Sequence, residues 1–277
     1  MRPTLNIIGA GKVGRVLGRL FSESGSFIVQ DVMTRSEAGA ADAVRFIGAG
    51  APASRIEQMR AANVWMLAVS DDQIEAACAQ LAAGTGAGAG LVGAVVFHCS
   101  GAKSAGALDA AARSGALTAS VHPIRSFADP DCVAQNFADT FCGVEGDSVA
   151  LALLGEALAA IGARAVPIDA AAKTVYHAAS VFASNYLVTV LDAALRAYQA
   201  AGIGEDVARQ LAGPLAAESL ANVMRIGAGA ALTGPIARGD VATVARQQQA
   251  LDAWDGPSGE LYRALATATT QLASRRG

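Results

Sequence analysis

Short apolar runs alternate with amphipathic stretches along the first half of the chain. Runs of about four to eight apolar residues are typical of strands that are buried on both faces of a sheet. Such runs predict strands at Leu5–Ile8, Phe27–Thr34, Asn63–Val69, Leu91–His98, Thr118–Val121, Thr140–Val144 and Ala163–Ile168, with a short strand or loop after Phe46-Ile47. Helical spacing of the apolar positions between them predicts helices at 13–21, 37–46, 53–62, 73–83, 105–113 and 149–161. This alternation predicts an α/β fold with a doubly wound parallel sheet.

The pattern changes at Asp169, after which the sequence has no strand-like run. Long Ala- and Leu-rich segments predict helices at 170–201, 205–227, 241–250 and 259–275. We therefore expect two domains: residues 1–168 form the sheet domain, and residues 169–277 form an all-α domain.

The first predicted strand leads into a G-x-G-x-x-G motif that opens a helix: Gly9-Ala10-Gly11-Lys12-Val13-Gly14. In a strand–turn–helix setting, this motif predicts a dinucleotide-binding site. The first glycine allows a tight turn, the second lets the backbone approach a pyrophosphate, and the third lets the helix pack on the strand. The N–H groups at the start of the helix would receive the phosphates. The alternative is a glycine-rich turn without a ligand.

The end of the second strand bears on the choice of cofactor. Asp31 lies about 20 residues beyond the glycines, where an acidic residue binds the ribose of NAD. However, the apolar pattern continues to Met33, which places Asp31 within the strand and Arg35 and Ser36 at its end. A guanidinium can bind a 2′-phosphate bidentately, and a serine hydroxyl can support it. We therefore favour NADP over NAD, although Arg35 could equally be a solvated loop charge.

Small or polar residues follow the other strands of the predicted sheet. They are Ser70-Asp71-Asp72, His98-Cys99-Ser100-Gly101 and His122-Pro123. Ligands bind at the carboxyl ends of strands in open α/β sheets, so these residues outline a polar cleft. Each of them alone is also ordinary turn chemistry. We expect cofactor contacts here from Val69, Ser70, Asp71 and Ser100.

The helix that begins near Ala170 carries polar residues on an apolar stripe. Lys173, His177 and Asn185 recur at multiples of four, and such groups need partners if they are buried. One explanation is a substrate pocket. The other is a core histidine with an interhelical hydrogen bond from Asn185. Further on, Gly234-Pro235 breaks a helix, before Arg238 and a possible N-cap at Asp240.

Composition limits the class of protein. Hydrophobic residues make up 53% and charged residues 16% of the 277, with a net charge of −3, which argues against nucleic-acid partners. The four cysteines lack C-x-x-C spacing and read as buried thiols in a reducing compartment, and we expect no metal site. Residues 76–102 and 174–191 are uncharged, but glycines interrupt the first run and polar side chains the second. We expect a helix buried within protein, no membrane partner and a cytoplasmic location.

Several motifs together resemble one family, the Rossmann-like proteins with a DUF2520 C-terminal domain. The motifs are Ala68-Val69-Ser70-Asp71-Asp72, His98-Cys99-Ser100-Gly101-Ala102, Ser120-Val121-His122-Pro123, Tyr176-His177-Ala178-Ala179, Ser184-Asn185-Tyr186-Leu187 and Leu232-Thr233-Gly234-Pro235-Ile236-Ala237-Arg238-Gly239-Asp240. The resemblance covers nearly the whole chain and implies an NADP oxidoreductase.

More distantly, the architecture is similar to pyrroline-5-carboxylate reductase, prephenate dehydrogenase and the β-hydroxyacid dehydrogenases. This likeness implies a helical domain of the 6-phosphogluconate dehydrogenase C-terminal type, a homodimer formed through it, and an active site in an interdomain cleft. The β-hydroxyacid enzymes place a lysine and an asparagine one turn apart. In this chain His177 stands at that spacing from Lys173, and Asn185 follows later.

The leading hypothesis is an NADP-dependent oxidoreductase that transfers a hydride between nicotinamide and a C=O or C=N group of a small, anionic metabolite. His177 is the first choice for the general acid, because an imidazole can titrate near neutral pH. Of the other expected catalytic residues, Ser100, His122 and Asn185 would orient or polarise the substrate, and Lys173 would bind a carboxylate, with Arg238 as the alternative. The alternatives are a dinucleotide-binding sensor or regulatory protein without catalysis, and a protein that keeps only the fold.

Overall fold

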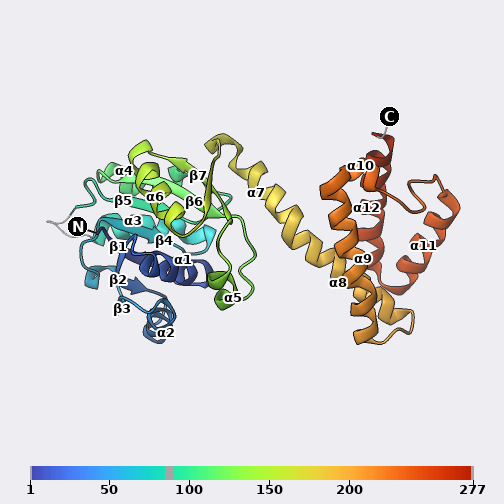
Figure 1. Cartoon of the computed structure of the whole chain (residues 1–277), viewed down its shortest axis with the longest axis horizontal. Coiled ribbons are helices and arrows are strands. Elements are labelled where there is room, and N and C mark those ends of the chain that lie inside the picture. Colours follow the sequence, from blue (N-terminus) through green and yellow to red (C-terminus); the bar gives the residue numbers. More distant parts are fainter. Residues whose placement is uncertain (1, 85–89, 276–277) are drawn as a thin grey trace. The chain divides into compact units, whose positions relative to one another are not determined.

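The computed structural model describes residues 2–84 and 90–275 (Figure 1). Part of the glycine-rich stretch within 76–102 lies outside these residues. The chain divides into two compact units, Met1–Ala183 and Ser184–Gly277. The last strand ends at Pro167, where the sequence pattern changes, and the unit boundary comes later because the following helix bonds to the first unit.

The first unit is built on one eight-stranded sheet. Its strands are β1 Thr4–Ile8, β2 Ile28–Met33, β3 Ala51–Ala53, β4 Val64–Leu67, β5 Val95–His98, β6 Leu117–Pro123, β7 Phe141–Gly146 and β8 Arg164–Pro167. Their order is β3-β2-β1-β4-β5-β6-β7-β8. Neighbouring strands are parallel except β6 and β7, so the predicted doubly wound sheet is confirmed with one reversal of direction.

Helices join the strands of the first unit. They are α1 Lys12–Glu23, α2 Glu37–Ile47, α3 Ile74–Gly84, α4 Asp109–Arg113, α5 Pro130–Gln135 and α6 Ser148–Ala160, with the 3₁₀ turns η1 Ile56–Gln58, η2 Asp71–Gln73 and η4 Ala105–Leu108. The helix expected at 53–62 is wrong, because this segment forms only β3 and η1. The helix expected at 105–113 is divided into η4 and α4, and α5 was not predicted.

Alternate residues of the central strands enter two cores on opposite faces of the sheet. On β4, Val64 and Met66 belong to the core that includes α1, α2 and α6 residues, whereas Trp65 and Leu67 belong to the core with α3 and α4. Side chains alternate across a strand, so burial on both faces gives a continuous apolar run. This is why the strands were readable from the sequence.

The segment after β8 is helical but not one uniform α-helix. It consists of η5 Ala170–Ala172, α7 Lys173–Val181, a π-helical turn η6 Phe182–Tyr186 and α8 Leu187–Ala200. The run 170–200 is long and apolar enough to cross a membrane by length and composition, with a mean hydropathy of 1.4 in its most apolar window. The expectation that this helix is buried within protein is wrong for the single chain, because none of that window is buried.

The second unit is helical throughout its described residues, as predicted. After α8, which packs on the next helix, come α9 Glu205–Ile226, α10 Ala228–Ala231, α11 Val241–Trp254 and α12 Gly256–Ser274. The expected N-cap is present, because Asp240 Oδ1 accepts a hydrogen bond from the backbone N–H of Thr243 at 3.0 Å. Among the described residues of this unit, the buried apolar side chains are only Ala208 and Ala212.

The cysteines depart from the expectation of four buried thiols. Cys78 and Cys142 are buried, Cys99 is half-buried, and Cys132 on α5 is exposed. Burial raises the pKa of both Cys99 and Cys142 to about 12, so these two thiols stay protonated at neutral pH.

Candidate functional site

The glycine turn fits tightly against the sheet and opens outward at one residue. Gly9 has a φ of +84°, and a Cβ on it would lie 2.6 Å from Val69 Cγ1. A Cβ on Gly14 would lie 2.4 Å from the carbonyl oxygen of Gly9, so this glycine allows α1 to pack on the turn. A Cβ on Gly11 would meet nothing within 4 Å. The turn is therefore tightly packed at Gly9 and Gly14 and borders open space at Gly11.

A cleft of about 920 Å³ lies where β1, β2 and β4 end. Seven of the expected cofactor-binding residues line it: Gly9, Ala10, Gly11, Arg35, Ser36, Val69 and Ser70. Further lining residues that the sequence reasoning did not select include Arg15, Thr34, Asp72, Gln73 and Gln80. The cleft lies at the ends of three of the five strands from which it was predicted, and neither His98–Gly101 nor His122-Pro123 lines it.

The other expected cofactor residues do not line this cleft. Lys12 Nζ donates to the carbonyl of Ala128 at 2.8 Å, and Val13 packs against the core. Gly14 is buried under the turn. Asp71 is exposed in η2, and its neighbour Asp72 lines the cleft instead. Ser100 is buried in the loop after β5 and belongs to a second cluster, described below.

The end of β2 separates the two candidates for ribose recognition. Asp31 is 5% exposed, and its Oδ1 accepts from Arg60 Nη2 at 2.6 Å while its Oδ2 accepts from the Arg60 backbone N–H at 2.7 Å. Ser36 caps α2, with its Oγ accepting from the Gly39 N–H at 3.1 Å. Arg35 lines the cleft and is exposed. The guanidinium of Arg35, and not the carboxylate of Asp31, is thus available to a ligand.

A histidine pair lies beyond the cleft, where β6 ends against α7. His122 Nδ1 and the Tyr176 hydroxyl are 2.8 Å apart, and the rings of His122 and His177 lie 5.5 Å apart at 77°. Gly101 approaches both imidazoles so closely that a Cβ there would lie 2.5 Å from His177 Cδ2 and 2.7 Å from His122 Cε1. The structure therefore brings together two of the expected catalytic residues, His122 and His177.

Burial controls the protonation of His122 and Tyr176. With the nearby charges of His177 and Lys173 acting in the same direction, burial lowers the pKa of His122 to about 4. Burial also raises the pKa of Tyr176 to about 12, so its hydroxyl keeps its proton. The Tyr176 hydroxyl and His122 Nδ1 share a hydrogen bond, and the tautomer of the imidazole decides which of the two donates. With Tyr176 as the donor, the neutral His122 carries its proton on Nε2.

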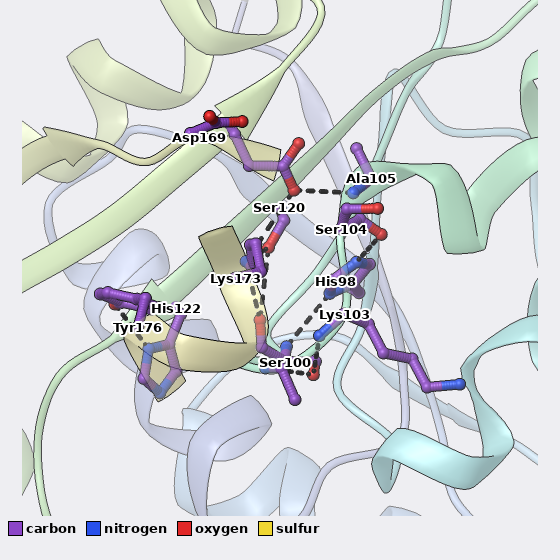
Figure 2. A network of polar contacts seen from close by, with 12 residues as sticks. His98, Ser100, Lys103, Ser104, Ala105, Ser120, His122, Asp169, Lys173 and Tyr176 are labelled. Carbon is purple, nitrogen blue, oxygen red and sulfur yellow. Dashed lines mark hydrogen bonds and ion pairs between the residues drawn. The ribbon is translucent and has the colours of Figure 1, made fainter. Parts of the chain in front are cut away.

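Lys173 is buried, and Figure 2 shows it between Ser120 and Ser100. Its Nζ donates to the Ser100 carbonyl at 3.2 Å and to Ser120 Oγ at 2.5 Å, and it lies 3.9 Å from Glu145 Oε1. With 1% of its surface exposed, Lys173 does not fit the carboxylate-binding role expected of it. Ser100 is similarly occupied, because its Oγ accepts from the N–H groups of Ala102 and Lys103.

Asn185, the remaining expected catalytic residue, lies in the second unit. It is exposed within η6, where α-helical spacing gives way to a π turn. The even spacing expected between Lys173, His177 and Asn185 therefore does not continue through this turn. Among the described residues, no group of three or more His, Cys, Asp or Glu side chains could hold a metal ion.

Two residues of this site, Tyr176 and Glu145, were not selected from the sequence. Tyr176 precedes His177 and was not selected, although Gly143 on the strand paired with His122 leaves room for its ring. Glu145 ends an apolar strand, where a buried carboxylate needs a partner. Both signals depend on knowing that β7 pairs with β6, which the sequence alone does not reveal.

Comparison with known proteins gives two family matches. Residues 1–123 match the family model of a Rossmann-like domain, and residues 140–269 match that of a domain of unknown function, DUF2520. These matches confirm the resemblance drawn from the motifs. No curated protein matches the chain.

Solved structures match along almost the whole length. An inferred NADP oxidoreductase from Bacteroides fragilis is 18% identical, with a TM-score of 0.79 and 98% of both chains covered. A Thermotoga maritima protein is 26% identical, with a TM-score of 0.72, covering 98% of this chain and 99% of that one. A Plasmodium falciparum pyrroline carboxylate reductase with NADP bound is 12% identical, with a TM-score of 0.61 and 98% of both chains covered. These likenesses show the shared fold.

Proposed function

We propose that this chain, which joins a Rossmann-like domain to a DUF2520 domain, is an NADP-dependent oxidoreductase that transfers a hydride between nicotinamide and a C=O or C=N group. The observation that carries the proposal is the glycine turn, which opens on a cleft lined by Arg35 and Ser36. The histidine pair at the end of β6 supports a chemical role for the same sheet edge. The NADP bound to the Plasmodium falciparum reductase of similar fold also supports it.

The cradle has the features that a pyrophosphate needs. The N-cap of α1 is Gly11, which has no side chain to cap the helix. The N–H groups of the first helical turn can therefore donate to an anion. The space beyond Gly11 is open, as the position of an added Cβ shows. Arg35 and Ser36 would bind a 2′-phosphate on the ribose, because Arg60 already occupies the carboxylate that would prefer the hydroxyl of NAD.

When bound, NADPH supplies the hydride, and the chain supplies the proton and the orientation. We assign proton donation to His177, because its imidazole lies beside that of His122 at the end of β6. We further assign the Nε2 tautomer to His122, with Nδ1 accepting from Tyr176, so that its Nε2 N–H can donate a hydrogen bond that polarises a carbonyl oxygen or an imine nitrogen.

An anionic substrate needs a cation other than Lys173. Lys173 is engaged within the first unit, and Lys103 is paired with Glu75. Of the carboxylate ligands expected from the sequence, Arg238 is left. We keep the anionic metabolite as part of the proposal, and Arg238 stays a prediction from the sequence for binding its carboxylate.

The first test is a fluorescence titration with NADPH and NADH, followed by assays of NADPH oxidation with a panel of keto acids, ketones and cyclic imines. The proposal predicts tighter binding of NADPH and turnover of at least one class. His177→Ala should lower turnover about a hundredfold with unchanged NADPH affinity. Arg113→Ala, on the surface of α4, is the matched control.

The possible outcomes separate the hypotheses. Unchanged turnover in His177→Ala would remove this residue from the mechanism. Binding of NADPH without oxidation across the panel would favour the dinucleotide-binding sensor. Failure to bind either nucleotide at millimolar concentration would contradict both the enzyme and the sensor.

We also propose that the chain forms a homodimer through its helical unit. Large apolar side chains are exposed along α9: Val207, Leu211, Leu215, Leu220 and Met224. A helical unit with only two buried apolar residues among those described has little core of its own. A second copy would cover exposed apolar side chains of α9, and exposed apolar surface marks association sites.

A further inference from the structure

Lys173 places an ammonium group where the interior of a sheet domain would normally exclude it. Burying a charge is costly unless partners replace the lost water. Here the partners come from three neighbouring segments: Ser100 after β5, Ser120 on β6 and Glu145 on β7 (Figure 2). Glu145 is itself held, with Oε1 accepting from the Ala105 N–H at 2.7 Å. One side chain at the first position of α7 thus joins three parts of the sheet.

The next turn of the same helix carries the candidate catalytic groups. Tyr176 and His177 follow Lys173 by three and four residues, which places them near its face of α7. Tyr176 bonds to His122, two residues beyond Ser120 on β6. Two attachments to one strand, at successive levels, set both the height and the rotation of the helix. A helix held at one point could pivot.

We propose that Lys173 is a positioning residue: by tying the start of α7 to β5, β6 and β7, it sets where Tyr176 and His177 meet His122. It does not touch substrate or cofactor. Its consequence for turnover rests on the proposed reductase function, whereas its effect on His122 does not.

The charge of Lys173 lowers the pKa of His122, and so does the burial that its position maintains. The groups that face His122 are His177, Tyr176 and Lys173 on α7, and Asp71 after β4. The charges of Lys173 and His177 oppose protonation of His122, and the charge of Asp71 favours it. Burial is the largest influence, and it depends on α7 covering the ring. Loss of Lys173 should therefore raise the pKa of His122 through both charge and position.

The test is imidazole NMR, because the chain has only three histidines. Wild-type protein and Lys173→Met are labelled at histidine, and His122→Asn assigns the signal. At pH 7 the wild-type His122 should show an unprotonated Nδ1 and a protonated Nε2. Lys173→Met should lose this single tautomer, and the His122 titration midpoint should rise by about one pH unit. Lys103→Met is the control, because that lysine pairs with Glu75 outside the network.

If Lys173→Met fails to fold, a second variant can test the same proposal. Ser120→Ala keeps the lysine and removes one partner, so a smaller change in the same direction is expected. A His122 spectrum unchanged in either folded variant, with only a lower melting temperature, would overturn the proposal and leave Lys173 a purely structural residue.

Activity provides the remaining readout. Lys173→Met should lower kcat about a hundredfold and leave the KM for NADPH within twofold, because the cradle at Gly9–Gly14 is untouched. A raised KM with unchanged kcat would contradict positioning. If wild-type protein neither binds nor oxidises NADPH, the proposed function fails, and the NMR result still decides the role of Lys173.

Discussion

His98 commits both of its ring nitrogens to the loop that follows β5. Its Nε2 donates to the Ser104 carbonyl at 3.0 Å, and its Nδ1 accepts from the Ser100 N–H at 3.1 Å. Protonation would remove that acceptor inside the protein. Burial lowers the pKa of His98 to about 4, below the value of about 6.5 in an unfolded chain. Between these values the unfolded chain binds more protons, so the free energy of unfolding falls as the pH falls through this window.

The variant His98→Gln should make stability less dependent on pH. For the wild type, this one residue should account for a loss of about 2 kcal/mol between pH 7 and pH 5. Glutamine cannot take up the proton, so its loss over the same range should be smaller by that amount. Urea unfolding at the two pH values measures both differences. Equal pH dependence in the two proteins would contradict a depressed pKa for His98.

Arg35 should decide which nucleotide binds. Arg35→Ala should weaken NADPH binding about tenfold or more and change NADH binding less than twofold, because a charged hydrogen bond to a phosphate would be lost. Fluorescence titration gives both constants, with Arg113→Ala as the surface control. Equal weakening of both nucleotides would mean that Arg35 contacts a shared part of the cofactor.

At the scale of residues, the sequence was informative where the position along an element decides exposure. Arg35 follows the last apolar residue of β2, so its place at the strand end was readable, and Asp31 was correctly placed within the strand. Lys173 was not readable in this way. Helical spacing groups residues on a face, but which neighbour covers that face depends on strands far away in the sequence.

At the scale of elements, two glycines in helices offer a matched comparison. Gly14→Ala adds a Cβ 2.4 Å from the Gly9 carbonyl, so it should cost about 2 kcal/mol of unfolding free energy and abolish NADPH binding. Gly155→Ala in α6 meets nothing within 4 Å and should stabilise by about 0.5–1 kcal/mol. Thermal unfolding and NADPH titration test both variants. NADPH binding by a folded Gly14→Ala protein would contradict the close-packing role.

Elements with a strong apolar period were predictable, and those defined by short-range capping or by pairing were not. α5 begins at Pro130 after the N-cap Asp129, a local signal without an apolar period to draw attention to it. The direction of β7 leaves no trace in its composition, because an apolar run reads the same both ways. The π turn at Phe182–Tyr186 similarly lies within an unbroken helical pattern.

At the scale of the whole molecule, the apolar side chains exposed on α9 should hold two chains together. Light scattering should give twice the mass of one chain. The double variant Leu211→Glu/Leu215→Glu should shift the protein towards monomer, because charges would replace apolar contact. Val92→Glu, at an exposed site in the first unit, is the control. A monomeric wild type at micromolar concentration would contradict the proposed dimer.

The reversed strand pair β7–β8 sets the direction in which α7 runs along the sheet. If the last strand were parallel to β6, it would end at the cleft edge of the sheet, and the next helix would run away from that edge. Because β8 runs away from that edge, α7 turns back along β6, from the level of Ser120 to that of His122. The DUF2520 match begins at residue 140, just before β7, so β7, β8 and α7 all lie within the same family model. A chimera between relatives should therefore be joined before β7, not after β8.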